Sequence, residues 1–280
     1  MKNLLVIIKN INVEAVLLEK ALRFSPESLC VVMVNPLGND EESISRKISD
    51  YIEHTKPGFS NLNVKFFYEI DALISADYLL KLSSDSQVDL IILTKPEIVD
   101  GLNGLDLIKD LLRSSTQAKI LMSRPTKWPS SVNVMCSIDV GSTDDHQIAL
   151  DRQVFNYAKD ELSDHLSINL HLASVISLSR VSQELELIEQ SEVLLKVGPV
   201  YREKLNTFDQ DHAVSDSKLL LAAGVPSKEI CALAKQHKME LVVIGNVGRK
   251  GLTGMIIGNT AEKILTNISA DVLVVNSNIQ

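Results

Sequence analysis

The stretch that most constrains the fold spans residues 241–276. Residues 241–244 form an apolar run with the length and β-branched content of a buried strand, and this run stops at Gly245. Residues 261–268 then carry apolar side chains at helical spacing, and residues 272–275 form a second apolar run. A strand, a glycine-containing loop, a helix and a strand in this order predict half of an open α/β sheet.

The loop after the first of these strands is typical of an anion-binding site. Glycines at the carboxyl end of a strand let the backbone approach a ligand and adopt positive φ angles, and Gly245 and Gly248 lie there. The N–H groups and the dipole of the next helix favour negative charge at the same place. Arg249 and Lys250 would add positive charge. The alternative is that the two glycines only turn the chain.

The start of the following helix also has two interpretations. Gly258 and Asn259 come just before the helical pattern, where the first N–H groups would face an anion. Asn259 is followed three residues later by Glu262, and this spacing resembles a capping box. Helix capping alone would therefore explain Asn259, and both interpretations stay open.

The three glycines carry a resemblance to a known family. Gly245, Gly248 and Gly258 have the spacing G-x2-G-x9-G, which resembles the nucleotide loop of the universal stress protein family. Nucleotide-binding members usually have Ser or Thr after the last glycine, where this chain has Asn259. The sequence VGRKGLTGMIIGNTAE is similar to the second half of the tandem, E-type members. This resemblance implies a cytoplasmic stress-response protein that binds ATP or another adenine nucleotide in its second half.

The resemblance also implies two further binding residues. In nucleotide-binding members, an aspartate at the end of the first strand accepts a hydrogen bond from adenine, and Asp139 matches that position. Val175 is the candidate for the matching position after the second strand. Aspartate is also common where a strand enters a loop, so Asp139 has a second interpretation as a solvated turn residue.

The chain contains an internal repeat. Apolar runs alternate with helical patterns over residues 1–125, and the alternation starts again over residues 132–280. Residues 126–131 between them, with Pro129 and two serines, predict a linker. Asp89 and the apolar run after it correspond to Glu240 and the run after it. The predicted fold class is α/β, with two flavodoxin-like (Rossmann-like) units in tandem, each a five-stranded, mainly parallel sheet flanked by helices.

The first unit lacks the nucleotide-type features of the second. Lys9 stands where Asp139 stands in the second unit, and a cation cannot accept adenine's amino hydrogen. Lys95 and Pro96 follow the fourth strand in place of the glycine loop, and proline removes an N–H donor. We interpret residues 1–125 as a degenerate copy that acts as a scaffold or interaction half.

Two structural details follow from the same patterns. The last strand of each unit, residues 120–122 and 272–275, would form an exposed sheet edge, so we expect the two units to pair as an intramolecular pseudo-dimer. A homodimer of the whole chain stays open.

In the second unit, a helical stretch over residues 193–208 is expected to be interrupted near Gly198 and Pro199.

Composition restricts the class of partner. The formal net charge is −8 and the calculated pI is about 5.3, which argue against a general surface for nucleic acid or anionic membranes. The first apolar run, residues 4–8, is too short for a signal peptide or a membrane span. Three cysteines lie far apart in apolar sequence, as expected in a reducing compartment. We therefore expect a cytoplasmic protein without nucleic-acid or membrane partners.

No catalytic or metal-binding motif is evident. The sequence has no G-x-S-x-G elbow, no Walker A pattern and no H-E-x-x-H, and its histidines are scattered. The leading hypothesis is a non-enzymatic regulatory or protective protein whose second unit binds an adenine nucleotide. The first alternative is an interaction protein whose glycine loop is only architectural. A slow ATP hydrolase ranks last, because no general base or Mg²⁺ ligand set can be named.

Overall fold

The computed structural model consists of two compact units, with the boundary between Pro129 and Ser130. It describes residues 1–34, 41–55, 62–69, 74–95, 103–114, 117–178, 189–209, 214, 218–246, 249–251, 254–256 and 259–276. Within these, nothing is described for the side chains of residues 103–105, 249–251, 254–256 and 259. Gly248, Gly258 and Pro96, which the sequence interpretation used, lie outside the described residues. The boundary falls inside the predicted linker.

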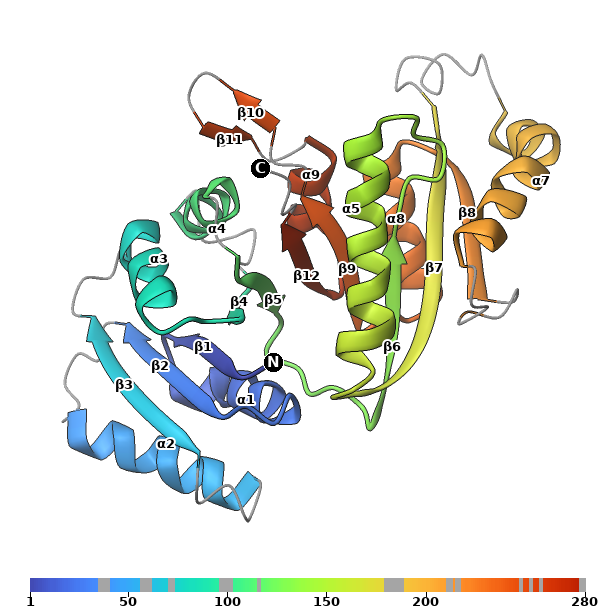
Figure 1. The fold of residues 1–280 in the computed structure, drawn as a ribbon. Helices are drawn as coiled ribbons and strands as arrows, with labels where there is room; N and C mark the ends of the chain where they lie inside the picture. Colours follow the sequence, from blue (N-terminus) through green and yellow to red (C-terminus); the bar gives the residue numbers. More distant parts are fainter. Residues whose placement is uncertain are drawn as a thin grey trace. The chain divides into compact units, whose positions relative to one another are not determined.

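The first unit is a parallel sheet flanked by helices (Figure 1, blue to green). Its strands have the order β3-β2-β1-β4-β5, and every neighbouring pair is parallel. In chain order the elements are β1 (Asn3–Ile8), α1 (Ile11–Arg23), β2 (Ser28–Val34), α2 (Glu41–Thr55), β3 (Asn63–Glu69), α3 (Ala76–Asp85), β4 (Leu90–Thr94), α4 (Asn103–Arg113) and β5 (Lys119–Ser123).

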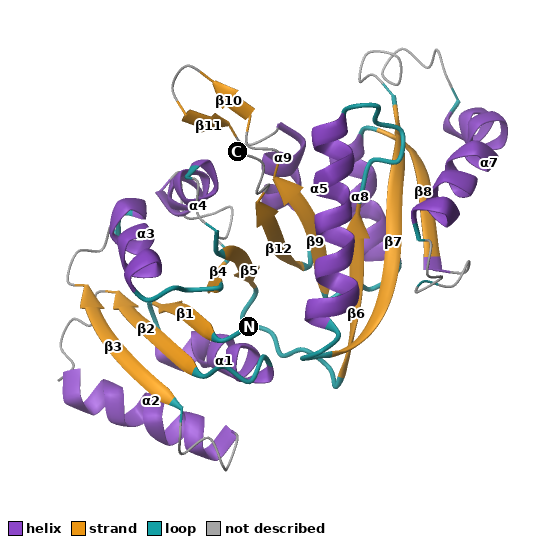
Figure 2. Ribbon diagram, in the orientation of Figure 1, coloured by secondary structure: helices purple, strands orange, loops and turns teal. Residues whose placement is uncertain are grey.

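The second unit repeats this topology (Figure 2). Its strand order is β12-β9-β6-β7-β8, again parallel throughout. In chain order the elements are β6 (Ser131–Ser137), α5 (Asp145–Asn156), which continues as a π-helical segment (Tyr157–Leu162), β7 (Ser167–Ser177), α7 (Gln190–Phe208), β8 (Leu219–Gly224), α8 (Pro226–Gln236), β9 (Leu241–Asn246), α9 (Asn259–Asn267) and β12 (Asp271–Asn276). Two short strands, β10 (Arg249–Gly251) and β11 (Gly254–Ile256), pair with each other between β9 and α9.

The central strands of both sheets are buried on both faces. Residues 4–8 of β1 and residues 241–244 of β9 are all buried, which explains why the sequence shows continuous apolar runs there without alternation. In the second unit, α5 packs against β6 and β9, while α7 packs against β7 and β8. This arrangement confirms the predicted α/β fold class with five-stranded parallel units.

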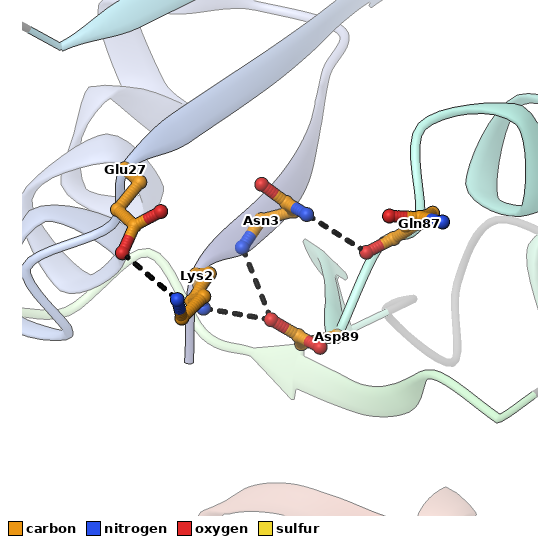
Figure 3. Close-up of polar contacts among 5 residues, drawn as sticks. All are labelled: Lys2, Asn3, Glu27, Gln87 and Asp89. Carbon is orange, nitrogen blue, oxygen red and sulfur yellow. Dashed lines mark hydrogen bonds and ion pairs between the residues drawn. The ribbon is translucent and has the colours of Figure 1, made fainter.

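The repeat extends to single hydrogen bonds at the amino ends of the strands. In the first unit, the Asp89 carboxylate accepts hydrogen bonds from the backbone N–H groups of Lys2 at 2.7 Å and Asn3 at 3.1 Å (Figure 3). In the second unit, the Glu240 carboxylate accepts one from the N–H of Asn133 at 2.7 Å. An acid at the start of the fourth strand therefore anchors the first strand in both units.

The predicted linker packs against the first unit. The Trp128 ring is buried at 7 % exposure and meets the Phe24 ring edge-on, with 6.2 Å between centroids. Lys20 Nζ lies 5.1 Å from the centre of the Trp128 ring, and Lys127 forms an ion pair with Glu19 at 2.8 Å. Contacts with α1 therefore hold the end of the first unit in place.

One expectation about the second unit is wrong. Helix α7 runs without interruption through Gly198 and Pro199. Gly198 is buried, and a Cβ atom built on it would lie 3.6 Å from Leu221 of β8, so the helix lies close to the sheet at this point. Packing of α7 against β7 and β8 offsets the hydrogen bond that Pro199 cannot donate.

Candidate functional site

The candidate site of the second unit lies at the carboxyl ends of β6 and β9. The chain leaves these neighbouring strands in opposite directions, toward β7 from one and toward β12 from the other, so a topological switch point lies between them. In the register of the sheet, Ser137 of β6 is level with Ile244 of β9 and with Ala173 of β7. Ligands of open α/β sheets bind beyond this end of the strands.

The register brings three of the sequence-predicted residues to one end of the sheet. Asp139 lies in the loop two residues beyond Ser137, and Val175 lies two residues beyond Ala173, the partner of Ser137 in β7. Gly245 follows Ile244 on β9. Asp139 is exposed, whereas the Val175 side chain is 7 % exposed.

The rest of the predicted glycine loop is only partly described. Asn259 is the first helical residue of α9, and nothing is described for its side chain, so its two interpretations stay predictions. Gly248 and Gly258 are outside the described residues, so their role stays a prediction.

Asp139 shapes the turn in which it lies. Its Oδ1 accepts a hydrogen bond from the backbone N–H of Gly141 at 3.0 Å, and its carbonyl oxygen accepts one from the N–H of Ser142 at 3.1 Å. This is the turn role that the sequence left open for Asp139. A carboxylate has about four acceptor positions, so the turn leaves capacity for a further donor.

Helix α7 supplies a residue that the sequence interpretation did not identify. A Cβ atom built on Gly141 would lie 2.1 Å from the hydroxyl oxygen of Tyr201, so residue 141 has to be glycine while Tyr201 lies over it. Burial, and then the negative charge of Asp139, raise the pKa of Tyr201. No sequence motif links Tyr201 to Asp139, because α7 reaches the loop only through tertiary packing.

An open pocket of about 470 Å³ lies between this loop, α5 and α7. Arg152 donates a hydrogen bond to the carbonyl oxygen of Phe208, and its guanidinium lies 4.0 Å from the centre of the Phe208 ring, so α5 is tied to the end of α7. The lining combines carboxylates, hydroxyls, cations and apolar groups: Asp139, Val140, Ser142, Ile148, Asp151, Arg152, Glu203, Lys204, Thr207 and Phe208.

Asp151 is the most deeply buried acid of this pocket. Its side chain is 3 % exposed, and burial raises its pKa to about 7. The negative charge of Asp139 adds to this increase, whereas hydrogen bonds from the Asp139 N–H and from Gln147 oppose it. Asp151 could not be predicted from the sequence, because an acid in a helical pattern is usually on the solvent face.

Gly245 has a packing role that needs no ligand. A Cβ atom on Gly245 would come within 2.6 Å of Leu150 Cγ and 2.7 Å of Leu150 Cδ2. Leu150 is completely buried between α5 and the sheet. Close contact between helix and strand therefore accounts for this glycine by itself.

At the corresponding strand ends of the first unit, an acidic side chain joins the two strands. Glu14 of α1 is 6 % exposed and accepts hydrogen bonds from the backbone N–H groups of Lys9 at 2.5 Å and Asn10 at 2.8 Å. The hydroxyl of Thr94 also donates to Glu14. Thr94 has the position in β4 that Gly245 has in β9, so Glu14 bridges the ends of β1 and β4. In the second unit, Asp151 accepts the equivalent hydrogen bond from the Asp139 N–H, and the glycine at 245 has no hydroxyl group to complete such a bridge.

The described ranges contain neither a metal-binding cluster nor a membrane-spanning helix. No group of three or more His, Cys, Asp and Glu side chains is arranged to hold a metal ion among these residues. In the same part of the chain, no helix is long and apolar enough to cross a lipid bilayer.

Comparison with known proteins identifies the family. The model of the universal stress protein family matches residues 137–276, which is half of the chain. The chain belongs to the universal stress protein family. The match begins at the end of β6 and includes Asp139, α7 and the glycine loop, so it covers the candidate site of the second unit.

Curated relatives of the universal stress protein family include E-type proteins. The chain is 24 % identical over 157 residues to a Universal stress protein E homolog of Haemophilus influenzae, a match that covers 55 % of this chain and 50 % of the relative. It is 22 % identical over 158 residues to Universal stress protein E of Escherichia coli K12, covering 56 % and 50 %. The chain spans about half the length of the curated relatives it matches.

Solved structures resemble the fold over both units. A putative universal stress protein from Pseudomonas aeruginosa UCBPP-PA14 is 23 % identical with a TM-score of 0.72, covering 99 % of this chain and 93 % of that chain. A functionally unknown protein from Pseudomonas aeruginosa PAO1 has the same identity and coverage with a TM-score of 0.74. At this identity the likeness concerns the fold alone.

Proposed function

We propose that this universal stress protein has a regulatory or protective role in the cytoplasmic stress response and binds an adenine nucleotide in its second unit. The observation that carries the proposal is the convergence of Asp139, Val175 and Gly245 at the carboxyl end of the sheet, beside the switch point between β6 and β9. Asp139 would accept a hydrogen bond from adenine's amino group while it keeps its bond from Gly141.

The proposal assigns one nucleotide to each chain. In the first unit, the Glu14 carboxylate takes the hydrogen bonds offered by the Lys9 and Asn10 N–H groups and by Thr94. These donors therefore already have an acceptor and are not available to an anionic ligand at the ends of β1 and β4. In the second unit, the equivalent strand end carries Gly245 and has no such carboxylate bridge between β6 and β9 among the described residues.

The second candidate function is a protein-interaction role without a nucleotide. The contact between Gly245 and Leu150 favours it, because packing explains one of the three loop glycines without a ligand. Only the first candidate function requires the protein to bind added nucleotide, so a binding measurement separates the two.

The direct test is calorimetric titration of the full chain with ATP. We expect one site per chain, and we expect Asp139→Ala to weaken binding about tenfold, the value of one hydrogen bond to a charged group. Lys9→Ala in the first unit is the matched control and should bind like the parent. Two equivalent sites would contradict the asymmetry, and no binding at millimolar ATP would favour the interaction role. Chromatography of small molecules released by denaturing the purified protein would identify a nucleotide carried from the cell.

A further inference from the structure

Asp151 connects helix α5 to the loop that carries Asp139. Its Oδ2 accepts a hydrogen bond from the backbone N–H of Asp139 at 3.0 Å, and its Oδ1 accepts one from Gln147 Nε2 at 2.8 Å. The Asp151 side chain that accepts both hydrogen bonds is 3 % exposed. The acid therefore fixes the start of the loop from inside the unit, at the point where the chain leaves β6.

The charged groups that face Asp151 come from several elements. Helix α5 also packs against β6, β9, β12 and the π-helical segment. The titratable group of β6 and β9 is the buried thiol of Cys136, whose pKa is raised by burial, and Asp271 is at the opposite, amino end of β12. The π-helical segment places its charges beyond the carboxyl end of α5: Lys159, Asp160 and Glu161. The charged side chains that share the pocket with Asp151 are Asp139 from the loop, Arg152 from α5, and Glu203 and Lys204 from α7.

Among these charged side chains, Asp139 acts most directly on Asp151. Burial raises the pKa of Asp151 to about 7, and the negative charge of Asp139 acts in the same direction. Asp151 therefore gains and loses its proton close to neutral pH. The two forms differ as hydrogen-bond partners, because an ionised carboxylate accepts more strongly from the Asp139 N–H than a protonated carboxyl group does.

We propose that Asp151, which is bonded to the backbone of Asp139, is a positioning residue of the nucleotide site, and that its change of charge couples ligand affinity to pH. This inference rests on the proposed function, and it adds a regulatory input to that site. A nucleotide over Asp139 covers the mouth of the pocket and brings negative charge. Both effects disfavour the ionised form of Asp151, so binding takes up a proton. Affinity therefore falls as pH rises through the titration of Asp151.

The test compares the parent with Asp151→Asn, which has the same shape and stays neutral. Asparagine keeps an oxygen for the Asp139 N–H, and the Gln147 amide can turn to accept from the new NH₂ group. ATP gains a proton on its terminal phosphate near about pH 6, and this contribution is the same in both proteins. We expect the parent's ATP affinity to fall several-fold more than the variant's between pH 6 and pH 8. Asp145→Asn, an exposed acid on the same helix, is the control and should follow the parent.

A second measurement needs no ligand. The amide resonance of Asp139 in ¹⁵N NMR spectra should titrate with a midpoint near Asp151's pKa in the parent and in Asp145→Asn, and should lose that step in Asp151→Asn. A purely structural role for Asp151 would lower stability without producing these linked pH profiles.

The outcomes separate the two proposals. ATP binding with the same pH profile in the parent and in Asp151→Asn, or an Asp139 amide that does not titrate, would overturn the coupling and leave the nucleotide site standing. Absence of ATP binding in every variant at every pH would overturn the nucleotide site and the coupling with it, even if the Asp139 amide titrates.

Discussion

Gly245 of β9 lies directly against Leu150 of α5, so close that a Cβ atom on residue 245 would come within 2.6 Å of Leu150 Cγ. The neighbour is a branched, fully buried side chain that has little room to move. A loop glycine that the sequence assigns to ligand approach thus has a second constraint, imposed by helix packing. If packing is the constraint, substitution of Gly245 should lower stability, whereas if ligand approach is the constraint, it should lower ligand affinity.

Gly245→Ala should therefore destabilise the second unit by about 1–3 kcal/mol, the usual cost of overpacking a core. Leu150→Ala alone should also destabilise, since it leaves a cavity. In the double variant the new methyl group occupies part of that cavity, so the two losses should be less than additive. Urea unfolding of the four proteins measures this coupling. If Gly245→Ala keeps its stability but loses ATP binding, ligand approach and not packing explains the glycine.

Lys238→Gly should stabilise the protein by about 0.5–1 kcal/mol. Lys238 follows α8 with a φ of 50°, a left-handed conformation that costs energy for any residue with a Cβ atom. The side chain is exposed, so little packing is lost. Lys228→Gly on the exposed face of the same helix is the matched control and should lose about 1 kcal/mol. Thermal unfolding at low protein concentration gives both values, and a loss of stability in Lys238→Gly would contradict the expected strain.

The raised pKa of Asp151 predicts the pH dependence of stability. An acid whose pKa rises from 3.8 in the unfolded chain to about 7 in the native state holds more protons when folded, so its contribution makes stability fall as pH rises from about 4 to about 7. Above pH 7 the loss is complete. Asp151→Asn should remove this slope and be more stable than the parent at pH 8, by on the order of 2–4 kcal/mol. Denaturant unfolding between pH 4 and pH 8 checks the sign, and a parent whose stability rises over that range relative to Asp151→Asn would contradict it.

Asn259→Ser tests the glycine loop. Serine is also a good helix N-cap, so unfolding of the ligand-free protein should change by well under about 1 kcal/mol. Its smaller hydroxyl group would crowd a phosphate less than the amide does, so ATP should bind measurably more tightly. Calorimetry at one pH compares the two proteins. A drop in ligand-free stability without a gain in affinity would mean that Asn259 serves the helix and no ligand.

The order of the elements and the repeat could be predicted from the sequence. Apolar runs of strand length separated by helical periods are local patterns, and buried parallel strands produce them directly, as residues 4–8 and 241–244 show. The correspondence between Asp89 and Glu240 was also visible, because each acid immediately precedes its apolar run. Because Asp139 comes directly after one of these apolar runs, its position at the carboxyl end of the sheet could be predicted from the sequence.

The residues that surround Asp139 depend on tertiary packing and could not be predicted. Glu14 and Asp151 look like ordinary helical acids in the sequence, and their burial depends on how each helix rotates against its sheet. Tyr201 meets Gly141 because α7 packs across the unit, a contact between distant parts of the chain that no local pattern encodes. Helix α7 also continues through Pro199 because of tertiary packing, since the packing energy can exceed the tendency of proline to end a helix. Spacing along the chain thus fixes which residues follow each strand, whereas packing fixes which of them touch.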